Sequence, residues 1–205
     1  TGSQTVCVFG NGPRAGTLAV VADYPTEQDV ALGPFSVASP QWAYLSMVAN
    51  LADVDLRDVY RTYAVRCHVP RGDDREKRLL AGVKQCAPFL WRELWSARPT
   101  SILTLGAGSF YAFTRSKGVS THRGQAFQWT LPCACDRGRC CAGTGSVADL
   151  ETHDPRGVQH ATPVLVHRHC ACRGVCHFDD APFTTWVVPS LSPGAVLARP
   201  NLHSA

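Results

Sequence analysis

The sequence lacks any apolar stretch close to the ~20 residues that a helix needs to cross a bilayer, so no membrane-spanning segment is expected. Its first residues also lack the charged and apolar regions of a signal peptide. Charge is sparse: 18% of the residues are charged, and the formal net charge is +4. These absences favour an intracellular, cytoplasmic protein. A net charge this small permits a polyanionic partner without requiring one.

The chain also lacks internal repeats of structural length, and its hydrophobic content of 45% is that of a globular protein. A length of 205 residues suits one domain with a substantial core, or a domain with a sizeable insertion. We expect a monomer.

Cysteine, by contrast, is abundant, with 10 residues in the chain. In an intracellular protein this number indicates metal binding before disulfides, and in a secreted protein the preference would reverse. Most of the cysteines lie in segment 132–182, which has few apolar residues and therefore needs an external cross-link. Structural Zn²⁺ bound by four cysteines, or by three cysteines and a histidine, would supply it, although the spacing is not that of a standard zinc finger. The candidate ligands are Cys133, Cys135, Cys140, Cys141, Cys170, Cys172 and Cys176, with His167, His169 and His177 adjacent.

Outside this segment, strand-like apolar runs alternate with helical patterns, which predicts a parallel sheet covered by helices on both faces. We therefore predict an α/β domain, a three-layer α/β/α sandwich, made of residues 1–131 and 183–205 and interrupted by a cysteine-rich, metal-stabilised insertion at 132–182. Pro88 is expected to bend or split one helix. Buried strands are predicted at 17–22, 59–65, 101–105 and 184–188, helices at 39–51, 73–95 and 110–115, and a hairpin stem at 125–131 with 163–167.

Polar residues follow the predicted strands at their carboxyl ends. Asp23 follows the first strand, Tyr63 and Arg66 end the second, Gly106 follows the third and Ser192 follows the fourth. In open α/β sheets the ligand crevice lies beyond these ends. We therefore expect these residues to gather at one rim of the sheet.

A set of short phrases, taken in order and spacing, resembles the uracil-DNA glycosylase superfamily, and most closely its iron–sulfur-containing bacterial and archaeal branch. The resemblance covers residues 8–129 and 184–200, and it implies the same three-layer fold with a short parallel sheet. Members of the superfamily flip one nucleotide out of DNA and cut its N-glycosidic bond, because that bond is inaccessible inside the helix. The phrases are Val8-Phe9-Gly10, Asp23-Tyr24-Pro25 with Glu27, Gly33-Pro34-Phe35, the strand that ends at Cys67, and Val187 to Leu197.

The resemblance implies that Asp23 is a catalytic residue that positions water, with Tyr24 and Pro25 beside it in the substrate pocket. The alternative is that Asp23 caps a turn by accepting hydrogen bonds from backbone amides, as Asp often does. Phe35 corresponds to the aromatic residue that stacks on the flipped base, and its alternative role is core packing. Tyr63 falls where relatives carry an asparagine that reads uracil through paired hydrogen bonds. One hydroxyl cannot reproduce that pattern, so uracil specificity is in doubt, and a half-buried strand aromatic is the alternative.

Ser192 stands where the superfamily has a catalytic histidine that donates a hydrogen bond to the base. Serine is a weaker and shorter donor, and Ser192-Pro193 also fits a helix start. Leu191 or Val196 is a candidate for the apolar wedge that enters the duplex. Arg199 is a candidate phosphate contact, although an exposed arginine is ordinarily only solvated.

Cys67 and Cys86 correspond to two of the four iron–sulfur ligands of that branch. The Cys-x-x-Cys pair that precedes the Val8-Phe9-Gly10 phrase in relatives is missing, and only Cys7 lies nearby. A [4Fe-4S] cluster would then need Cys7 or a cysteine of segment 132–182. Otherwise Cys67 and Cys86 are buried thiols without a metal.

The leading hypothesis is a DNA glycosylase that excises a modified pyrimidine other than plain uracil. A hypermodified base of phage DNA is an attractive substrate, which would place the enzyme in antiviral defence in a bacterial or phage-infected cell. A second hypothesis is a DNA-binding or replication-accessory module that kept the fold and lost catalysis. A third is an ordinary uracil-DNA glycosylase with unusual residues.

Overall fold

The structure, a computed structural model, describes residues 6–14, 17–36, 38–131 and 183–198. Within these ranges a five-stranded sheet has the order β2-β1-β3-β5-β4, in which β4 alone is antiparallel to its neighbour. The predicted α/β fold with a mostly parallel sheet is confirmed. The strands are β1 (Leu18–Ala22), β2 (Tyr60–Tyr63), β3 (Ser101–Leu105), β4 (Phe127–Leu131) and β5 (Phe183–Ser190).

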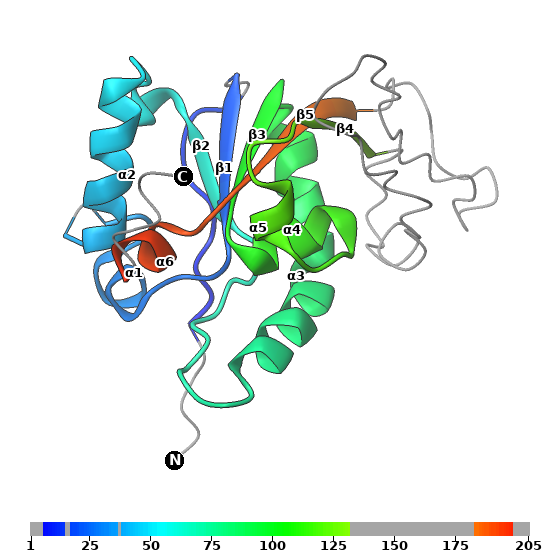
Figure 1. The fold of residues 1–205 in the computed structure, drawn as a ribbon. Coiled ribbons are helices and arrows are strands. Elements are labelled where there is room, and N and C mark those ends of the chain that lie inside the picture. Colours follow the sequence, from blue (N-terminus) through cyan, green and yellow to red (C-terminus); the bar gives the residue numbers. More distant parts are fainter. Residues whose placement is uncertain (1–5, 15–16, 37, 132–182, 199–205) are drawn as a thin grey trace.

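Helices cover both faces of this sheet, as the three-layer prediction requires (Figure 1). On one side lie α1 (Glu27–Leu32), α2 (Pro40–Leu51) and α6 (Pro193–Leu197), with α6 packed on α2. On the other side lie α3 (Arg75–Ala97), α4 (Ala107–Thr114) and α5 (Val119–His122), with α4 packed on α3. A short 3-10 helix, η1 (Leu56–Asp58), leads into β2. Among the residues that the structure describes, no helix combines the length and apolar character that crossing a bilayer requires.

Of the two expectations for Pro88, a split of the helix is wrong, because α3 is one continuous element around it, and a bend stays a prediction. Interior proline costs about 3 kcal/mol by removing a backbone hydrogen bond and clashing with the preceding turn. The apolar stripe continues on both sides of the proline, with Val83 and Ala87 before it and Leu90 and Leu94 after it, all fully buried. Burial of this stripe offsets the local cost.

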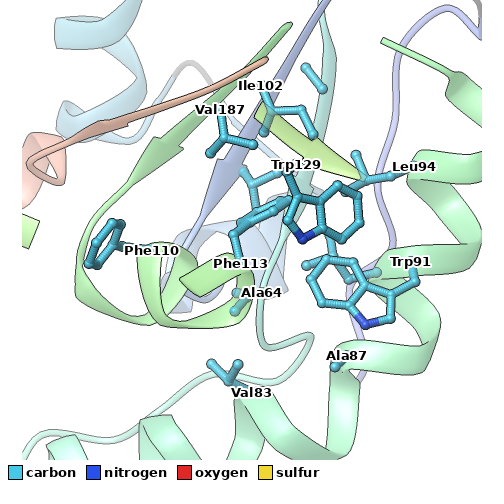
Figure 2. Packing of buried hydrophobic residues seen from close by; sticks show 14 of the residues in the cluster. Ala64, Val83, Ala87, Trp91, Leu94, Ile102, Phe110, Phe113, Trp129 and Val187 are labelled. Atoms are coloured by element: carbon cyan, nitrogen blue, oxygen red, sulfur yellow. The ribbon is translucent and has the colours of Figure 1, made fainter. Parts of the chain in front are cut away.

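The larger core lies between the sheet and the α3–α4 layer (Figure 2). Trp129 of β4 packs on Trp91 of α3 at 4.9 Å and on Phe113 of α4 at 5.2 Å between ring centroids. A second, smaller core fills the α1–α2 side of the sheet. On β1, Ala19 and Val21 face the larger core and Val20 faces the smaller one, which is the alternation of a strand buried on both faces.

The strand predicted at 125–131 corresponds to β4, which pairs antiparallel with β5 through Leu131 opposite Phe183. Segment 132–182 therefore connects two strands that are neighbours in the sheet. Its proposed hairpin partner, 163–167, lies outside the described residues, as do all seven of its cysteines. The domain boundaries and the metal-stabilised insertion remain predictions.

Candidate functional site

The strand order places a topological switch point between β1 and β3. The chain leaves β1 through α1 and α2 to reach β2, and then returns through α3 to β3 on the other side of β1. Connections on opposite faces open a crevice at the carboxyl ends of such a strand pair. Asp23 directly follows β1, and Gly106 directly follows β3, so both lie at this point.

The Asp23 carboxylate is held at the amino end of α4. Its Oδ1 accepts a hydrogen bond from the backbone N–H of Ser109 at 2.7 Å, across 86 residues of sequence. Burial raises the pKa of Asp23 from its ordinary value of 3.8 to about 6, against the lowering effects of hydrogen bonds from Ser109 and Gly108 and of the Arg75 charge. A carboxyl group with this pKa is mostly ionised at neutral pH and is basic enough to take a proton from water.

Gly106 makes room for that carboxylate. Its φ of +117° is a conformation that side chains rarely adopt, and a Cβ built there would lie 2.6 Å from Cγ of Asp23. The carbonyl of Ser190 accepts a hydrogen bond from the Gly106 amide at 2.9 Å, so the end of β5 lies next to Gly106. The sequence marked Gly106 as a strand-end residue, but not as the partner of Asp23.

Tyr24 and Pro25 lie beside Asp23 in contact with two residues that the sequence did not single out. The guanidinium of Arg75 lies over the Tyr24 ring at 5.2 Å, and His68 meets that ring edge-on at 6.1 Å. His68 Nδ1 is 3.1 Å from the carbonyl oxygen of Pro25, which is buried. Arg75 is exposed, so it adds positive charge to the rim next to the carboxylate.

Phe35 and Tyr63, two predicted base contacts, contact each other. Their rings stack with centroids 4.3 Å apart and planes 7° from parallel, and both residues are buried. The Phe35 amide donates a hydrogen bond to the Tyr63 hydroxyl at 3.1 Å, and Trp42 packs edge-on against Phe35. One face of the Phe35 ring is therefore covered by Tyr63.

Asp29 organises the loop that carries Phe35, a role that the sequence analysis did not predict. Its carboxylate is buried, caps its own helix through Thr26, and accepts hydrogen bonds from the Ser36 amide at 3.2 Å and from Trp42 Nε1 at 3.1 Å. Burial, followed by the Asp29 charge, raises the pKa of Tyr63 well above its usual range. Tyr63 is thus a neutral hydroxyl at any physiological pH.

Ser192 is the N-cap of α6. Its Oγ accepts a hydrogen bond from the Ala195 amide at 3.2 Å, and Pro193 occupies the first helical position. This is the helix start that the Ser192-Pro193 pair predicts as the alternative to a catalytic role. Leu191 is partly buried against the larger core. Both residues follow Ser190, whose carbonyl binds Gly106. Arg199 lies outside the described residues.

Three cysteines lie in the described part of the chain, and two of them are close together. Cys7 Sγ is 3.5 Å from Cys67 Sγ. Burial, followed by the contact with Cys7, raises the pKa of Cys67 to about 11, and Cys86 is near enough to contribute. A [4Fe-4S] cluster takes four cysteine thiolates, so these three do not complete one. Within the described ranges, no group of three or more His, Cys, Asp and Glu residues has an arrangement suited to a metal ion.

Comparison with known proteins gives one distant similarity. The chain is 26% identical over 130 residues to the Type-4 uracil-DNA glycosylase of Saccharolobus solfataricus. The aligned part covers 60% of this chain and 58% of that protein, so the chain matches little more than half the length of this relative. No protein-family model matches the chain. The similarity agrees with the superfamily that the sequence phrases resemble, and membership of its iron–sulfur branch stays a prediction.

Proposed function

We propose that the chain is a DNA glycosylase that accepts a flipped nucleotide and hydrolyses its N-glycosidic bond, leaving an abasic site. The observation that carries the proposal is the Asp23 carboxylate at the switch point between β1 and β3, anchored by Ser109 and with its pKa raised by burial. The similarity to a uracil-DNA glycosylase supports the same activity. We further propose an intracellular monomer whose partner is DNA.

In this mechanism, the bond between C1′ of the sugar and the base nitrogen breaks, and its electron pair leaves with the base. Positive charge then develops on the sugar, and the ionised Asp23 stabilises it and orients the water that adds to C1′. The proton lost by that water passes to Asp23. Ser192 is proposed to donate a hydrogen bond to the departing base. A hydroxyl that accepts one bond, here from Ala195, keeps its own proton for donation.

For the substrate, we propose a modified pyrimidine rather than plain uracil. Tyr63 stands where relatives bind uracil through an asparagine, and its ring lies on Phe35, the proposed stacking platform. Uracil could stack on the face of Phe35 that Tyr63 covers only after Tyr63 moved. We propose that a different base is recognised by other groups near Asp23, among them Tyr24, which follows Asp23 in the chain, and Arg75 and His68, which both contact the Tyr24 ring.

A panel of DNA substrates tests this proposal. Oligonucleotides with uracil, hydroxymethylated or glucosylated pyrimidines are incubated with the protein, and abasic sites are detected by alkaline strand cleavage. We expect cleavage of at least one modified pyrimidine at a rate at least about tenfold above that of uracil, which corresponds to about 1.4 kcal/mol of discrimination. Preferential cleavage of uracil would contradict the substrate proposal, and no cleavage of any substrate by folded protein would contradict the activity.

Two substitutions at Tyr63 accompany the panel as a matched pair. Tyr63→Asn removes the ring that covers Phe35 and supplies an amide, so it is expected to raise cleavage of uracil. Tyr63→Phe keeps the ring stack and removes only the hydroxyl that accepts from Phe35, so uracil cleavage should stay at the level of the unmodified protein. Equal behaviour of the two variants would remove Tyr63 from base selection.

The pH dependence of the reaction tests the role of Asp23. The ionised carboxylate is the active form, and its pKa is about 6. Single-turnover rates measured from about pH 5 to about pH 8 should therefore rise close to tenfold per pH unit at the acidic end and level off above about pH 6–7. A rate that falls with rising pH over this range would show that another group controls the reaction.

A DNA-binding module without catalysis is the second candidate. The observations that favour it are the covered face of Phe35 and the use of Asp23 as a hydrogen-bond acceptor for α4. It predicts DNA binding in a mobility-shift assay that Asp23→Asn leaves unchanged, together with no abasic product from any substrate of the panel.

A further inference from the structure

Charge is distributed unevenly between the two helical layers. Residues 71–98, which contain α3, carry seven Lys and Arg against four Asp and Glu. Residues 99–131, which contain α4 and α5 of the same layer, add three Lys and Arg and no Asp or Glu. Residues 26–58, on the opposite side of the sheet, carry one arginine against five Asp and Glu (Figure 1). A small net charge for the whole chain is thus compatible with a strongly basic face on the α3 side.

Three cations lie in one line on the outer face of α3. Lys77, Lys84 and Arg92 are all exposed. The intervals of seven and eight residues between them are close to two helical turns, so their side chains leave the helix on the same side. The carboxylates of α3 and of its N-cap are engaged with other cations. Each forms an ion pair of 2.7 Å, and the pairs are Asp74 with Arg78, Glu76 with Lys117 and Glu93 with Arg66.

An exposed aromatic ring lies beside this line. Phe89 is 46% exposed, and the guanidinium of Arg92 lies 5.8 Å from the centroid of its ring. The guanidinium of the buried Arg66 lies over the same ring at 5.0 Å and over the Phe9 ring at 4.8 Å. Arg66 thus holds Phe89 in place while much of the ring stays open to solvent.

Cations that alternate with aromatic rings are typical of surfaces that bind single-stranded nucleic acid, because the cations contact phosphates and unpaired bases stack on the rings. Bases inside a duplex already stack on one another, so a duplex makes no use of such a ring. The combination on α3 therefore favours a single strand.

The line of cations begins at the candidate site. Arg75, the first residue of α3, lies over the ring of Tyr24, which follows Asp23 in the chain. From Arg75 to Arg92 the helix rises by about 25 Å. A DNA strand advances by about 3.4 Å per stacked nucleotide, so this length matches about seven nucleotides.

We propose that the outer face of α3 binds a single-stranded flank of the DNA substrate, with phosphates on Lys77, Lys84 and Arg92 and a base stacked on Phe89. The inference rests on the proposed function in one respect, since it takes the bound strand to be the one that enters the Asp23 site. It adds a strand preference, because single-stranded DNA then binds more tightly than a duplex of the same sequence.

Fluorescence anisotropy with the full chain tests the phosphate contacts. The probes are a labelled strand of about 20 nucleotides with ordinary bases only, which is longer than the expected site, and its duplex. Lys84→Gln combined with Arg92→Gln should weaken single-strand binding about 10–30-fold at about 0.1 M salt. The slope of log affinity against log salt should become shallower by about 1.4, because each lost phosphate contact removes about 0.7. Arg57→Glu is the matched control, since it changes the net charge by the same amount at a residue of the opposite layer whose side chain is 90% exposed. Its affinity should stay within about threefold of the unmodified protein.

Two substitutions at Phe89 test the stacking contact. Phe89→Leu keeps an apolar side chain against Arg66 but removes the ring, so single-strand binding should weaken about tenfold while duplex binding stays unchanged. Phe89→Trp keeps a ring and should bind the single strand at least as tightly as the unmodified protein. A purely structural role of Phe89 would instead weaken the binding of both probes together.

Four outcomes would overturn the proposal. They are equal effects of the α3 double variant and Arg57→Glu, an unchanged single-strand affinity of Phe89→Leu, tighter binding of the duplex than of the single strand, and no binding of either probe. The probes contain no modified base, so binding is measured whether or not the protein cleaves DNA. Absence of abasic product from every substrate of the panel would therefore contradict the proposed activity and leave this DNA contact standing.

Discussion

Asp23→Asn is expected to lower the rate of abasic-site formation by about 10²–10⁴-fold on the best substrate of the panel. Asparagine keeps the shape of the side chain and can still accept the Ser109 hydrogen bond, but it carries no charge and takes no proton. The measurement is single-turnover cleavage under saturating enzyme. Asp53→Asn is the matched control, because Asp53 is an exposed residue at positive φ, a conformation that asparagine tolerates, and its activity should be unchanged.

The same substitution should stabilise the protein at neutral pH. In the unfolded chain Asp23 ionises near 3.8, and in the folded chain near 6, so the folded state binds the proton more tightly between these values. The free energy of unfolding therefore falls as pH rises from about 4 to about 6, and a neutral asparagine removes that loss. Urea denaturation should show a gain of about 2–3 kcal/mol at pH 7 that vanishes toward pH 4. A loss of stability at pH 7 would instead identify Asp23 as a structural cap of α4.

Gly106→Ala is expected to lower the free energy of unfolding by about 3–5 kcal/mol and to displace the Asp23 carboxylate. One part of the cost is a side chain at φ +117°, a glycine conformation worth about 1–3 kcal/mol. The other part is overpacking against Asp23, since the new Cβ would lie 2.6 Å from Cγ of that residue. Urea denaturation measures the first effect, and a rate of abasic-site formation lowered beyond the loss of folded protein measures the second.

Gly33→Ala separates the two parts. Gly33 has a similar backbone conformation, with φ +100°, but a Cβ there would meet no atom within 4 Å. Its substitution should therefore cost only the backbone strain. If Gly33→Ala and Gly106→Ala were equally destabilised, the contact between Gly106 and Asp23 would have no energetic consequence.

The order and type of the elements could be predicted from the sequence because local patterns carry that information. The apolar runs at 17–22, 101–105 and 184–188 correspond to β1, β3 and β5, and the Ser39-Pro40 start corresponds to α2. The position of Asp23 beyond a buried strand also followed from the sequence, since parallel strands end at one edge. Pro88 does not split its helix, because its local cost is outweighed by contacts made along the whole of α3.

The partners of these residues could not be predicted in the same way. Tyr63 and Phe35 were assigned separately to a flipped base, and nothing in their local sequence indicates that the two rings stack on each other. From the sequence, Asp29 would be taken for an ordinary residue in the first turn of a helix. Its carboxylate nevertheless accepts hydrogen bonds from Thr26, Ser36 and Trp42. Each of these contacts depends on how two loops pack, and the sequence of either loop alone does not contain that information.

By itself, the sequence determined an α/β chain with a carboxylate beyond its first strand, because periodicity and turn residues act within a few positions of one another. Only the tertiary structure decided that Asp23 accepts a hydrogen bond from Ser109, which lies 86 residues further along the chain. It likewise decided that Cys7 contacts Cys67, from which it is separated by 60 residues. These long-range contacts depend on the strand order and on how closely neighbouring groups approach the backbone at Gly106 and Gly10. They also determine the environment of Asp23, because the burial that raises its pKa is created by the packed elements together.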